Sequence, residues 1–334
     1  MAFKLAYQKD ETDNELEGHD CVIHLFQIAP ALKRLSLNKD LWFRSQARRA
    51  SIWRKAIIPI PWGQLTHYID ADEVYGAASD FVETLSKMKN IEYLAVKTKS
   101  LQLLNLPHPP PSSPIPLHSL KHLSLDFYFL AGPGFFPDCF DVFEFENLVS
   151  LRMIGIPELD FDSGLNGPLF KAHNFLNKLR GLRKLEHLSL GGQNQITSST
   201  LEKILEAVPS VKFLDIDFPI LTVQKLFDIL FYSSALPLLT TFAWVPRSCD
   251  GVEMRDRMRE FVTSRTEVEL QHPLQNIQLY GSGVKFIFDT VEEVIRGRGN
   301  VLLEKCEGSR WEHWLFRDPY LDDWREAREI LPSA

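Results

Sequence analysis

Apolar residues recur along the chain in a fixed spacing: one apolar residue, two other positions, a second apolar residue, one position and a third. Because side chains alternate between the two faces of a strand, this spacing predicts a short β-strand with one apolar face. From Leu32 to Leu274 the pattern makes eight intervals over 242 residues, a mean period of about 30 residues. The triplets, with Asp70 in one degenerate third place, are Leu32-Leu35-Leu37, Leu65-Tyr68-Asp70, Ile91-Leu94-Val96, Leu120-Leu123-Leu125, Leu148-Leu151-Met153, Leu185-Leu188-Leu190, Val211-Leu214-Ile216, Leu239-Phe242-Trp244 and Leu274-Ile277-Leu279.

A helical pattern follows the central triplet, with Leu201, Ile204, Leu205 and Val208 at the spacing of one helix face. One strand and one helix cannot bury these faces alone, so the units must stack on neighbours of the same kind. The sequence therefore predicts an α/β solenoid shaped as a horseshoe. We expect a mainly parallel sheet on its concave face and helices on its convex face.

The extent of the repeat divides the chain into three segments. Residues 1–18 form an N-terminal segment with one strand-like stretch, which we interpret as an incomplete first repeat. Residues 19–299 form the solenoid. Residues 300–334 lose the repeat and gain aromatic residues that include Trp311, Trp314 and Trp324, so we expect an aromatic and helical cap over the last repeat.

The strand pattern also predicts which side chains form the binding surface. The residue before the second apolar position points to the concave side, and an aromatic and imidazole ridge there suits a protein or peptide partner. The predicted protein-binding residues are Arg34, His67, Tyr93, His122, His187 and Phe213. We expect the three imidazoles to titrate near neutrality. The alternative is that these rings stack between neighbouring strands and bind no ligand.

The central repeat carries a family resemblance. Its residues Leu185, Leu188, Leu190, Gln193, Ile196, Thr197, Leu201 and Ile204 fall in the positions of a cysteine-containing leucine-rich repeat, with Gln193 where that subclass has Cys or Asn. The irregular repeat lengths and proline-punctuated strands resemble fungal F-box/leucine-rich-repeat-like proteins. The resemblance implies a non-catalytic interaction module, similar to the substrate-recognition part of a receptor of an SCF-type ubiquitin ligase. A free-standing scaffold or inhibitor is the alternative.

An F-box normally opens on a Leu-Pro pair near the N-terminus. The only proline before Pro59 is Pro30, which lies in the repeat pattern, so no F-box is recognisable. We therefore expect a ubiquitin-ligase adaptor as partner only if an F-box module is missing from this chain.

The amino-acid composition narrows the classes of protein to which the chain could belong. The 334 residues are 45% hydrophobic and 24% charged, and the net charge of -7 argues against nucleic-acid binding. No apolar run approaches the roughly 18 residues that cross a bilayer, and the charged N-terminus is unlike a signal peptide. The four cysteines lie far apart in the sequence. We expect an intracellular protein, cytoplasmic or nuclear, that is monomeric and binds no membrane.

No catalytic motif is recognisable, so we expect no enzyme, no cofactor and no metal, with a hydrolase as a remote alternative. His19, Cys21 and His24 have loosely metal-like spacing but lack a second ligand pair. Two further segments are left open as binding sites: the basic stretch 33–55 and the proline-rich stretch 106–116.

Overall fold

The structure is a computed structural model, and it divides into two compact units, Met1–Val211 (unit 1) and Lys212–Ala334 (unit 2). The described residues are 2–5, 32–37, 60–102, 114–127, 142–154, 172–191, 197–218, 220–232, 235–244, 252–266, 272–280, 285–296 and 301–306. The predicted α/β class with a mainly parallel sheet is confirmed. Most of the basic stretch 33–55 and of the proline-rich stretch 106–116 lies outside the described residues, as do His19, Cys21 and His24.

Unit 1 contains a sheet whose described pairings are all parallel. Its strands, in sheet order, are β1 (Ala2–Leu5), β2 (Arg34–Leu37), β3 (His67–Ala77), β4 (Tyr93–Gln102), β6 (His122–Phe127), β8 (Ser150–Ile154) and β9 (His187–Gly191). Strand β1 pairs with β2 through Phe3 and Leu35, so the strand-like stretch near the N-terminus joins the sheet. A separate two-stranded sheet pairs β5 (Ile115–Pro116) with β7 (Phe143–Glu144).

A recurrent turn precedes seven of the strands in the two units, namely β3, β4, β6, β8, β9, β10 (Phe213–Asp217) and β11 (Thr241–Trp244). In this turn the backbone N–H of the first triplet residue donates to the carbonyl of an apolar residue three positions earlier, as Leu120 does to Leu117 at 3.0 Å. The same bond joins Leu65 to Trp62 of the 3-10 turn η2 (Trp62–Gln64), Ile91 to Met88, Leu148 to Phe145, Leu185 to Leu182, Val211 to Val208 and Leu239 to Leu236. Both residues of these pairs are buried, except the partly exposed Trp62. The turn therefore anchors the starts of these strands in the core.

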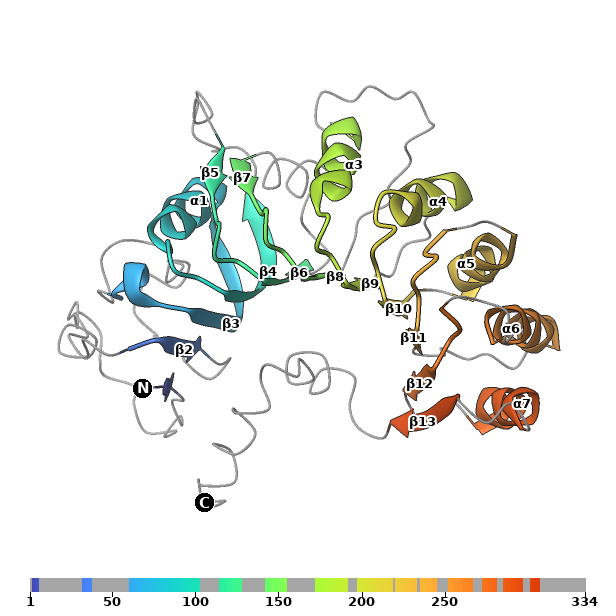
Figure 1. Cartoon of the computed structure of the whole chain (residues 1–334). Helices are drawn as coiled ribbons and strands as arrows, with labels where there is room; N and C mark the ends of the chain where they lie inside the picture. The colour runs from blue at the N-terminus through green and yellow to red at the C-terminus, as the bar shows by residue number, and fades with distance from the viewer. Residues whose placement is uncertain are drawn as a thin grey trace, which may run out of the picture. The chain divides into compact units, whose positions relative to one another are not determined.

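The helices of unit 1 are α1 (Ala78–Lys87), α3 (Ala172–Gly181) and α4 (Ser198–Glu206), and they lie on one side of the strands (Figure 1). Helix α4 begins at the N-cap Thr197, whose hydroxyl accepts a hydrogen bond from the Thr200 backbone N–H at 3.2 Å. Its apolar face, Leu201, Ile204 and Leu205, is fully buried, as the sequence pattern predicted. Each such side chain contributes roughly 1.5–3 kcal/mol of burial free energy.

Unit 2 repeats this architecture with an aromatic core. Its parallel strands are β10 (Phe213–Asp217), β11 (Thr241–Trp244), β12 (Asn276–Tyr280) and β13 (Leu302–Cys306), and its helices are α5 (Ile220–Tyr232), α6 (Val252–Arg265) and α7 (Lys285–Ile295). The Phe227 ring lies 5.2 Å from Phe261 and 5.6 Å from Trp244, all fully buried. These rings fill the space between helices α5 and α6 and strand β11.

Strand β13 is a feature that the sequence analysis did not anticipate. It lies within the segment 300–334 assigned to a cap, yet it pairs in parallel with β12 from Asn276↔Leu302 to Tyr280↔Cys306. Lys305 stands opposite the buried Leu279, where every preceding strand but one has an apolar residue. Because Lys305 is not apolar, β13 lacks the third apolar residue of the triplet, and the sequence pattern did not reveal the strand. Residues 307–334, including Trp311, Trp314 and Trp324, lie outside the described residues.

Arg265, at the end of α6, joins three elements of unit 2. Its guanidinium donates to the carbonyl of Leu230 in α5 at 2.7 Å and to that of Ala235 at 2.9 Å. A longer bond of 3.4 Å reaches the carbonyl of Leu236, which has a positive φ of 53°. Burial lowers the pKa of Arg265 from its ordinary value. The cation thus satisfies carbonyls at the end of α5 and holds a strained turn before β11.

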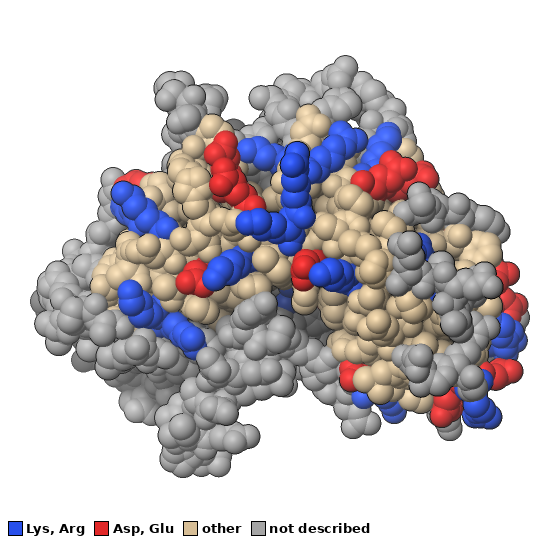
Figure 2. Space-filling view, in the orientation of Figure 1, with Lys and Arg blue, Asp and Glu red and all other residues tan. Residues whose placement is uncertain are grey.

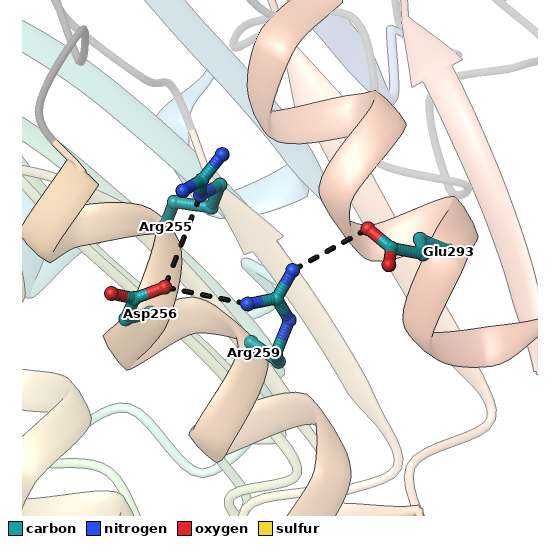
Figure 3. Close-up of polar contacts among 4 residues, drawn as sticks. All are labelled: Arg255, Asp256, Arg259 and Glu293. Atoms are coloured by element: carbon teal, nitrogen blue, oxygen red, sulfur yellow. Dashed lines mark hydrogen bonds and ion pairs between the residues drawn. The ribbon is translucent and has the colours of Figure 1, made fainter.

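Ion pairs link neighbouring helices on the surface of unit 2. Arg259 of α6 lies 3.4 Å from Glu293 of α7 and 3.4 Å from Asp256, which also faces Arg255 (Figure 3). Arg257 of α6 pairs with Asp228 of α5. These groups are largely exposed, so each pair contributes at most about 1 kcal/mol.

Candidate protein-interaction face

The predicted ridge residues occupy one register position. Each of them is the first residue of its strand, and the described pairings align them across unit 1. The aligned chain is Ala2↔Arg34, Arg34↔His67, His67↔Tyr93, Tyr93↔His122, His122↔Ser150 and Ser150↔His187. Phe213 holds the same position in unit 2, where it aligns with Thr241 and then Asn276. The alignment predicted from strand alternation is therefore confirmed within each unit.

A repeated backbone contact fixes this register. The Thr66 carbonyl accepts hydrogen bonds from both Glu92 N–H at 2.8 Å and Tyr93 N–H at 3.0 Å. The Glu92 carbonyl accepts in the same way from Lys121 and His122 at 2.9 and 3.0 Å. Because one carbonyl holds two successive amides at each strand start, a shift of one residue would break both bonds. The ladder position is thus set by the backbone and not by the side chains that occupy it.

We call the sheet face of unit 1 that points away from α1, α3 and α4 the ladder face. In β8 the side chains alternate, with Leu151 and Met153 buried and Ser150 and Arg152 partly exposed. The ladder face therefore carries two parallel columns. The first is Arg34, His67, Tyr93, His122, Ser150 and His187, and the second continues two residues later with Ser36, Ile69, Ala95, Ser124, Arg152 and Ser189.

Three rings of the first column lie against one another. The rings of His67 and Tyr93 are stacked with centroids 5.9 Å apart and planes at 14°, and Tyr93 and His122 follow at 6.0 Å and 33°. Parallel strands lie about 4.8 Å apart, so rings at equal register positions on neighbouring strands meet in this way. The alternative interpretation, stacking between strands, is therefore observed. Whether the same residues also bind a partner stays a prediction.

Burial differs along the column. Tyr93 is 3% exposed and His122 is 5% exposed, whereas Arg34, His67, Ser150 and His187 are partly exposed. The side chains of Tyr93 and His122 are therefore buried, and their contact with a partner stays a prediction. Strand alternation assigns a side chain to a face but does not set its depth, and stacking from both sides buries the middle of the row. Tyr93 and His122 form a floor between partly exposed ends.

The environment of His122 opposes its protonation. Burial, reinforced by His187, His67 and Lys121, lowers the pKa of His122 to about 4, and Glu92 opposes this shift only weakly. The expectation that this imidazole titrates near neutrality is therefore wrong. At neutral pH it is an uncharged ring in the floor of the ladder face.

A charged pair that the sequence analysis did not predict borders the first column of the ladder face. Lys121 Nζ donates to Glu92 Oε2 at 2.8 Å, joining the residues that precede His122 and Tyr93. This hydrogen bond lowers the pKa of Glu92 despite partial burial, with smaller contributions from the charges of Lys121, His67 and His122. The sequence could have revealed this pair. Because Tyr93 and His122 align on neighbouring strands, the residues that precede them, Glu92 and Lys121, must also lie side by side.

The equivalent face of unit 2 has different chemistry. Asp215 stands in the second column, followed in register by Ala243, Gln278 and Glu304. Gln278 Nε2 donates to Glu304 Oε2 at 2.7 Å, and the Tyr280 hydroxyl donates to Gln278 Oε1 at 2.7 Å. The column carries carboxylates and amides where unit 1 has hydroxyls and a guanidinium.

Figure 2 shows Lys and Arg side chains gathered over α3 on the surface drawn. The end of α3 and the turn into β9 supply the exposed Arg180, Arg183 and Lys184. Lys184 Nζ donates to Asn147 Oδ1 at 2.6 Å, and Asn147 Nδ2 donates to the His118 carbonyl at 2.7 Å. Cations in the last turn favour the helix dipole, which gives this cluster a structural role.

The described residues show no metal site and no membrane-spanning helix. Among the described residues, no three or more His, Cys, Asp or Glu side chains gather so as to hold a metal ion. In the same part of the chain, no helix combines the length and the apolar character needed to cross a membrane. In comparisons with known proteins, no family model matches the chain and no curated protein matches it significantly.

Proposed function

We propose that this chain is a non-catalytic protein-interaction module, built as a leucine-rich-repeat solenoid, that binds its partner on the ladder face. The observation that carries the proposal is the in-register column from Arg34 to His187. A row of unlike side chains held at one register position offers an extended partner successive, regularly spaced contacts.

The arrangement of the column supports binding as well as packing. Tyr93 and His122 provide a buried floor of two adjacent rings, and partly exposed polar side chains flank it on both sides. Protein interfaces commonly combine a desolvated aromatic centre with a polar surround.

We further propose that the module is similar to the substrate-recognition part of an F-box/leucine-rich-repeat receptor of an SCF-type ubiquitin ligase. The support is the resemblance of the central repeat, Leu185 to Ile204, to the cysteine-containing subclass. A free-standing scaffold or inhibitor uses the same face without a ligase. Co-purification of an adaptor and a cullin with the natural full-length protein separates the two.

Quantitative affinity purification of the tagged chain from its native cells tests the proposal. The variant His67→Ala/His187→Ala removes two partly exposed ladder side chains and leaves the buried His122 in place. We expect it to lose specific partners while the variant Lys203→Ala/Glu206→Ala, on helix α4, retains them. Equal recovery of every partner by the wild type and the ladder variant would rule out the ladder face as the binding surface.

A further inference from the structure

A second surface, apart from the ladder face of unit 1, lies in unit 2 where β12 and β13 run side by side (Figure 1). We infer that this surface binds an arginine side chain of a partner protein. Four residues form it, and together we call them the β12–β13 patch: Asn276, Gln278, Leu302 and Glu304. Their register, their hydrogen bonds and the exposure of Leu302 carry the inference.

The backbone places these four side chains on one face of the sheet. In β12 the side chains of Asn276 and Gln278 are partly exposed, and Ile277 between them is buried. Parallel pairing sets Leu302 opposite Asn276 and Glu304 opposite Gln278. Residues two apart in a strand are separated by about 7 Å, and neighbouring strands by about 5 Å. The patch is therefore about as large as one long side chain.

Hydrogen bonds fix the polar half of the patch. The Tyr280 hydroxyl donates to Gln278 Oε1 at 2.7 Å, so the Gln278 amide turns its Nε2 toward Glu304. Gln278 Nε2 then donates to Glu304 Oε2 at 2.7 Å. Within the described part of the chain, the Glu304 carboxylate has no other hydrogen bond and no ion pair. A carboxylate accepts several hydrogen bonds, so Glu304 is held in place with acceptor capacity left over.

A second acceptor of the patch also lacks a donor. Asn276 Oδ1 is buried, and none of the described residues donates a hydrogen bond to it. A buried acceptor without a donor destabilises a protein, because it has lost its bonds to water. The Asn276 side chain is partly exposed as a whole, so rotation of its amide about the Cβ–Cγ bond brings Oδ1 to the surface. A ligand that donates there would satisfy this oxygen.

Leu302 adds an apolar surface beside these acceptors. It stands in register with Asn276, in the last strand of the described sheet, and it is 55% exposed. Of the described large apolar residues, Phe231 alone is exposed to a similar degree, at 39%. A single exposed leucine is common at protein surfaces, so it is the acceptors next to Leu302 that mark it as part of a binding surface.

A carboxylate, an amide and an apolar side chain together suit arginine. The guanidinium carries five N–H donors in one plane, which can serve both Glu304 and Asn276, and the aliphatic stem can cover Leu302. The guanidinium forms paired hydrogen bonds with a carboxylate and is weakly hydrated, whereas the lysine ammonium is a strongly hydrated point charge. Arginine is also among the residues that contribute most to binding energy in protein interfaces.

The same backbone positions in unit 1 lack this combination. In β8 and β9 they hold Ser150 opposite His187 and Arg152 opposite Ser189. None of these residues is a carboxylate or a side-chain amide. The preference for arginine therefore follows from the side chains of unit 2 and not from parallel pairing itself.

Biolayer interferometry with short immobilised peptides and the full chain in solution tests the inference. The probes alternate serine and glycine around one central residue, which is arginine, lysine or citrulline, the uncharged analogue of arginine. We expect the arginine peptide to bind, the lysine peptide to bind about threefold more weakly and the citrulline peptide at least about tenfold more weakly. No binding of the arginine peptide, or equal binding of the arginine and citrulline peptides, would overturn the inference.

Matched variants locate the binding. Glu304→Gln keeps an acceptor for Gln278 but removes the charge, and we expect it to weaken binding of the arginine peptide at least about fivefold. The control Glu260→Gln removes the same charge from an exposed position of α6 and should change the affinity less than about twofold. An equal loss in the two variants would assign the effect to net charge and refute the patch.

Two further variants decide the matter if Glu304→Gln does not fold. Leu302→Ser changes an exposed side chain and should weaken binding of the arginine peptide about threefold. Asn276→Thr introduces the residue that stands at the same position in β11, Thr241. It should weaken binding without lowering the melting temperature, because it removes a buried acceptor that has no donor. Undiminished binding by both variants would contradict the inference.

The patch lies outside the ladder face, so the two surfaces are tested separately. If the arginine peptide fails to bind while His67→Ala/His187→Ala still loses its partners, the patch is refuted and the ladder face stands. If the arginine peptide binds through Glu304 while partner capture is insensitive to the ladder variant, the patch stands and the ladder face is refuted.

Discussion

The strands of unit 1 and those of unit 2 differ in the chemistry of their side chains while sharing one backbone pattern. In unit 1 the second ladder column contains Ser124, Arg152 and Ser189, whereas in unit 2 it contains Asp215, Gln278 and Glu304. Both columns are held in register by parallel pairing. The comparison teaches that the repeat fixes the position of each side chain. The type of residue at that position can vary, and it sets the charge of the surface.

The cores differ as well. Aliphatic residues such as Leu188 dominate the sheet side of the unit 1 core, whereas Phe227, Phe242, Trp244 and Phe261 form a ring cluster in unit 2. Unit 2 also uses Arg265 and the ion pairs between its helices. Stability in unit 1 should therefore depend on its aliphatic core, and in unit 2 partly on the partly buried cation Arg265.

The largest expected effect comes from a charge in the unit 1 core. Leu188→Asp places a carboxylate at a position that is 0% exposed, and we expect it to lower the free energy of unfolding by at least about 4 kcal/mol. The matched control is Ser189→Asp, one residue along the strand on the ladder face, which should cost about 1 kcal/mol or less. Chemical unfolding followed by circular dichroism measures both, and similar losses would mean that the two faces are misassigned.

The next effect tests unit 2. Arg265→Met leaves the carbonyls of Leu230 and Ala235 without their donor, so we expect a loss of about 3 to 4 kcal/mol in unfolding free energy. Arg259→Met, which removes an exposed cation from the same helix, is the control. Thermal unfolding that is equally sensitive to both would show that Arg265 is not a structural anchor.

The third effect concerns the pH dependence of unit 1. With a pKa near 4 in the folded chain, His122 binds a proton in the unfolded chain first, so its contribution destabilises the fold as pH falls from about 6.5 to about 4. Glu92, whose folded pKa is lowered, also loses its stabilising contribution in acid. Comparing His122→Gln with the wild type isolates the histidine.

We expect the difference in unfolding free energy between His122→Gln and the wild type to change by about 2 to 3 kcal/mol across that range, in favour of the variant at low pH. Urea unfolding at a series of pH values measures it, with the exposed His118→Gln as control. A difference that is independent of pH would contradict the buried, uncharged state of His122.

The smallest effect concerns the helix surface of unit 2. Arg259→Glu should lower stability by about 0.5 kcal/mol, because the side chains of Arg259 and Glu293 are exposed. The exchange Arg259→Glu/Glu293→Arg should recover part of that loss. A double-mutant cycle with no coupling would show that this pair does not join α6 to α7.

Much of the fold could be predicted because strand alternation and a fixed period are strong signals. They located the first residue of each ladder strand from Arg34 to Asn276 and the apolar face of α4. The turn that precedes most of the strands was also visible, since an apolar residue stands three positions before each of Ile91, Leu120 and Leu185. The sequence analysis did not use this apolar position, because the triplets alone were enough to define the period of about 30 residues.

Other features depend on contacts that no local pattern encodes. The depth of His122 follows from its neighbours on adjacent strands, and the clamp of Arg265 joins residues 29 to 35 positions apart. Strand β13 was hidden because Lys305 interrupts its apolar face. Periodicity thus predicts which face a side chain belongs to, while burial and charge depend on the assembled sheet.

The most direct test of the central claim, that the ladder face of unit 1 is the binding surface, is site-specific photo-crosslinking to a partner identified by affinity purification. Benzoylphenylalanine replaces either Ser150, partly exposed on the ladder face, or Gly181, where an added Cβ meets nothing within 4 Å beside α3. We predict that the partner crosslinks at Ser150 and not at Gly181. Crosslinking at Gly181 alone would contradict the account.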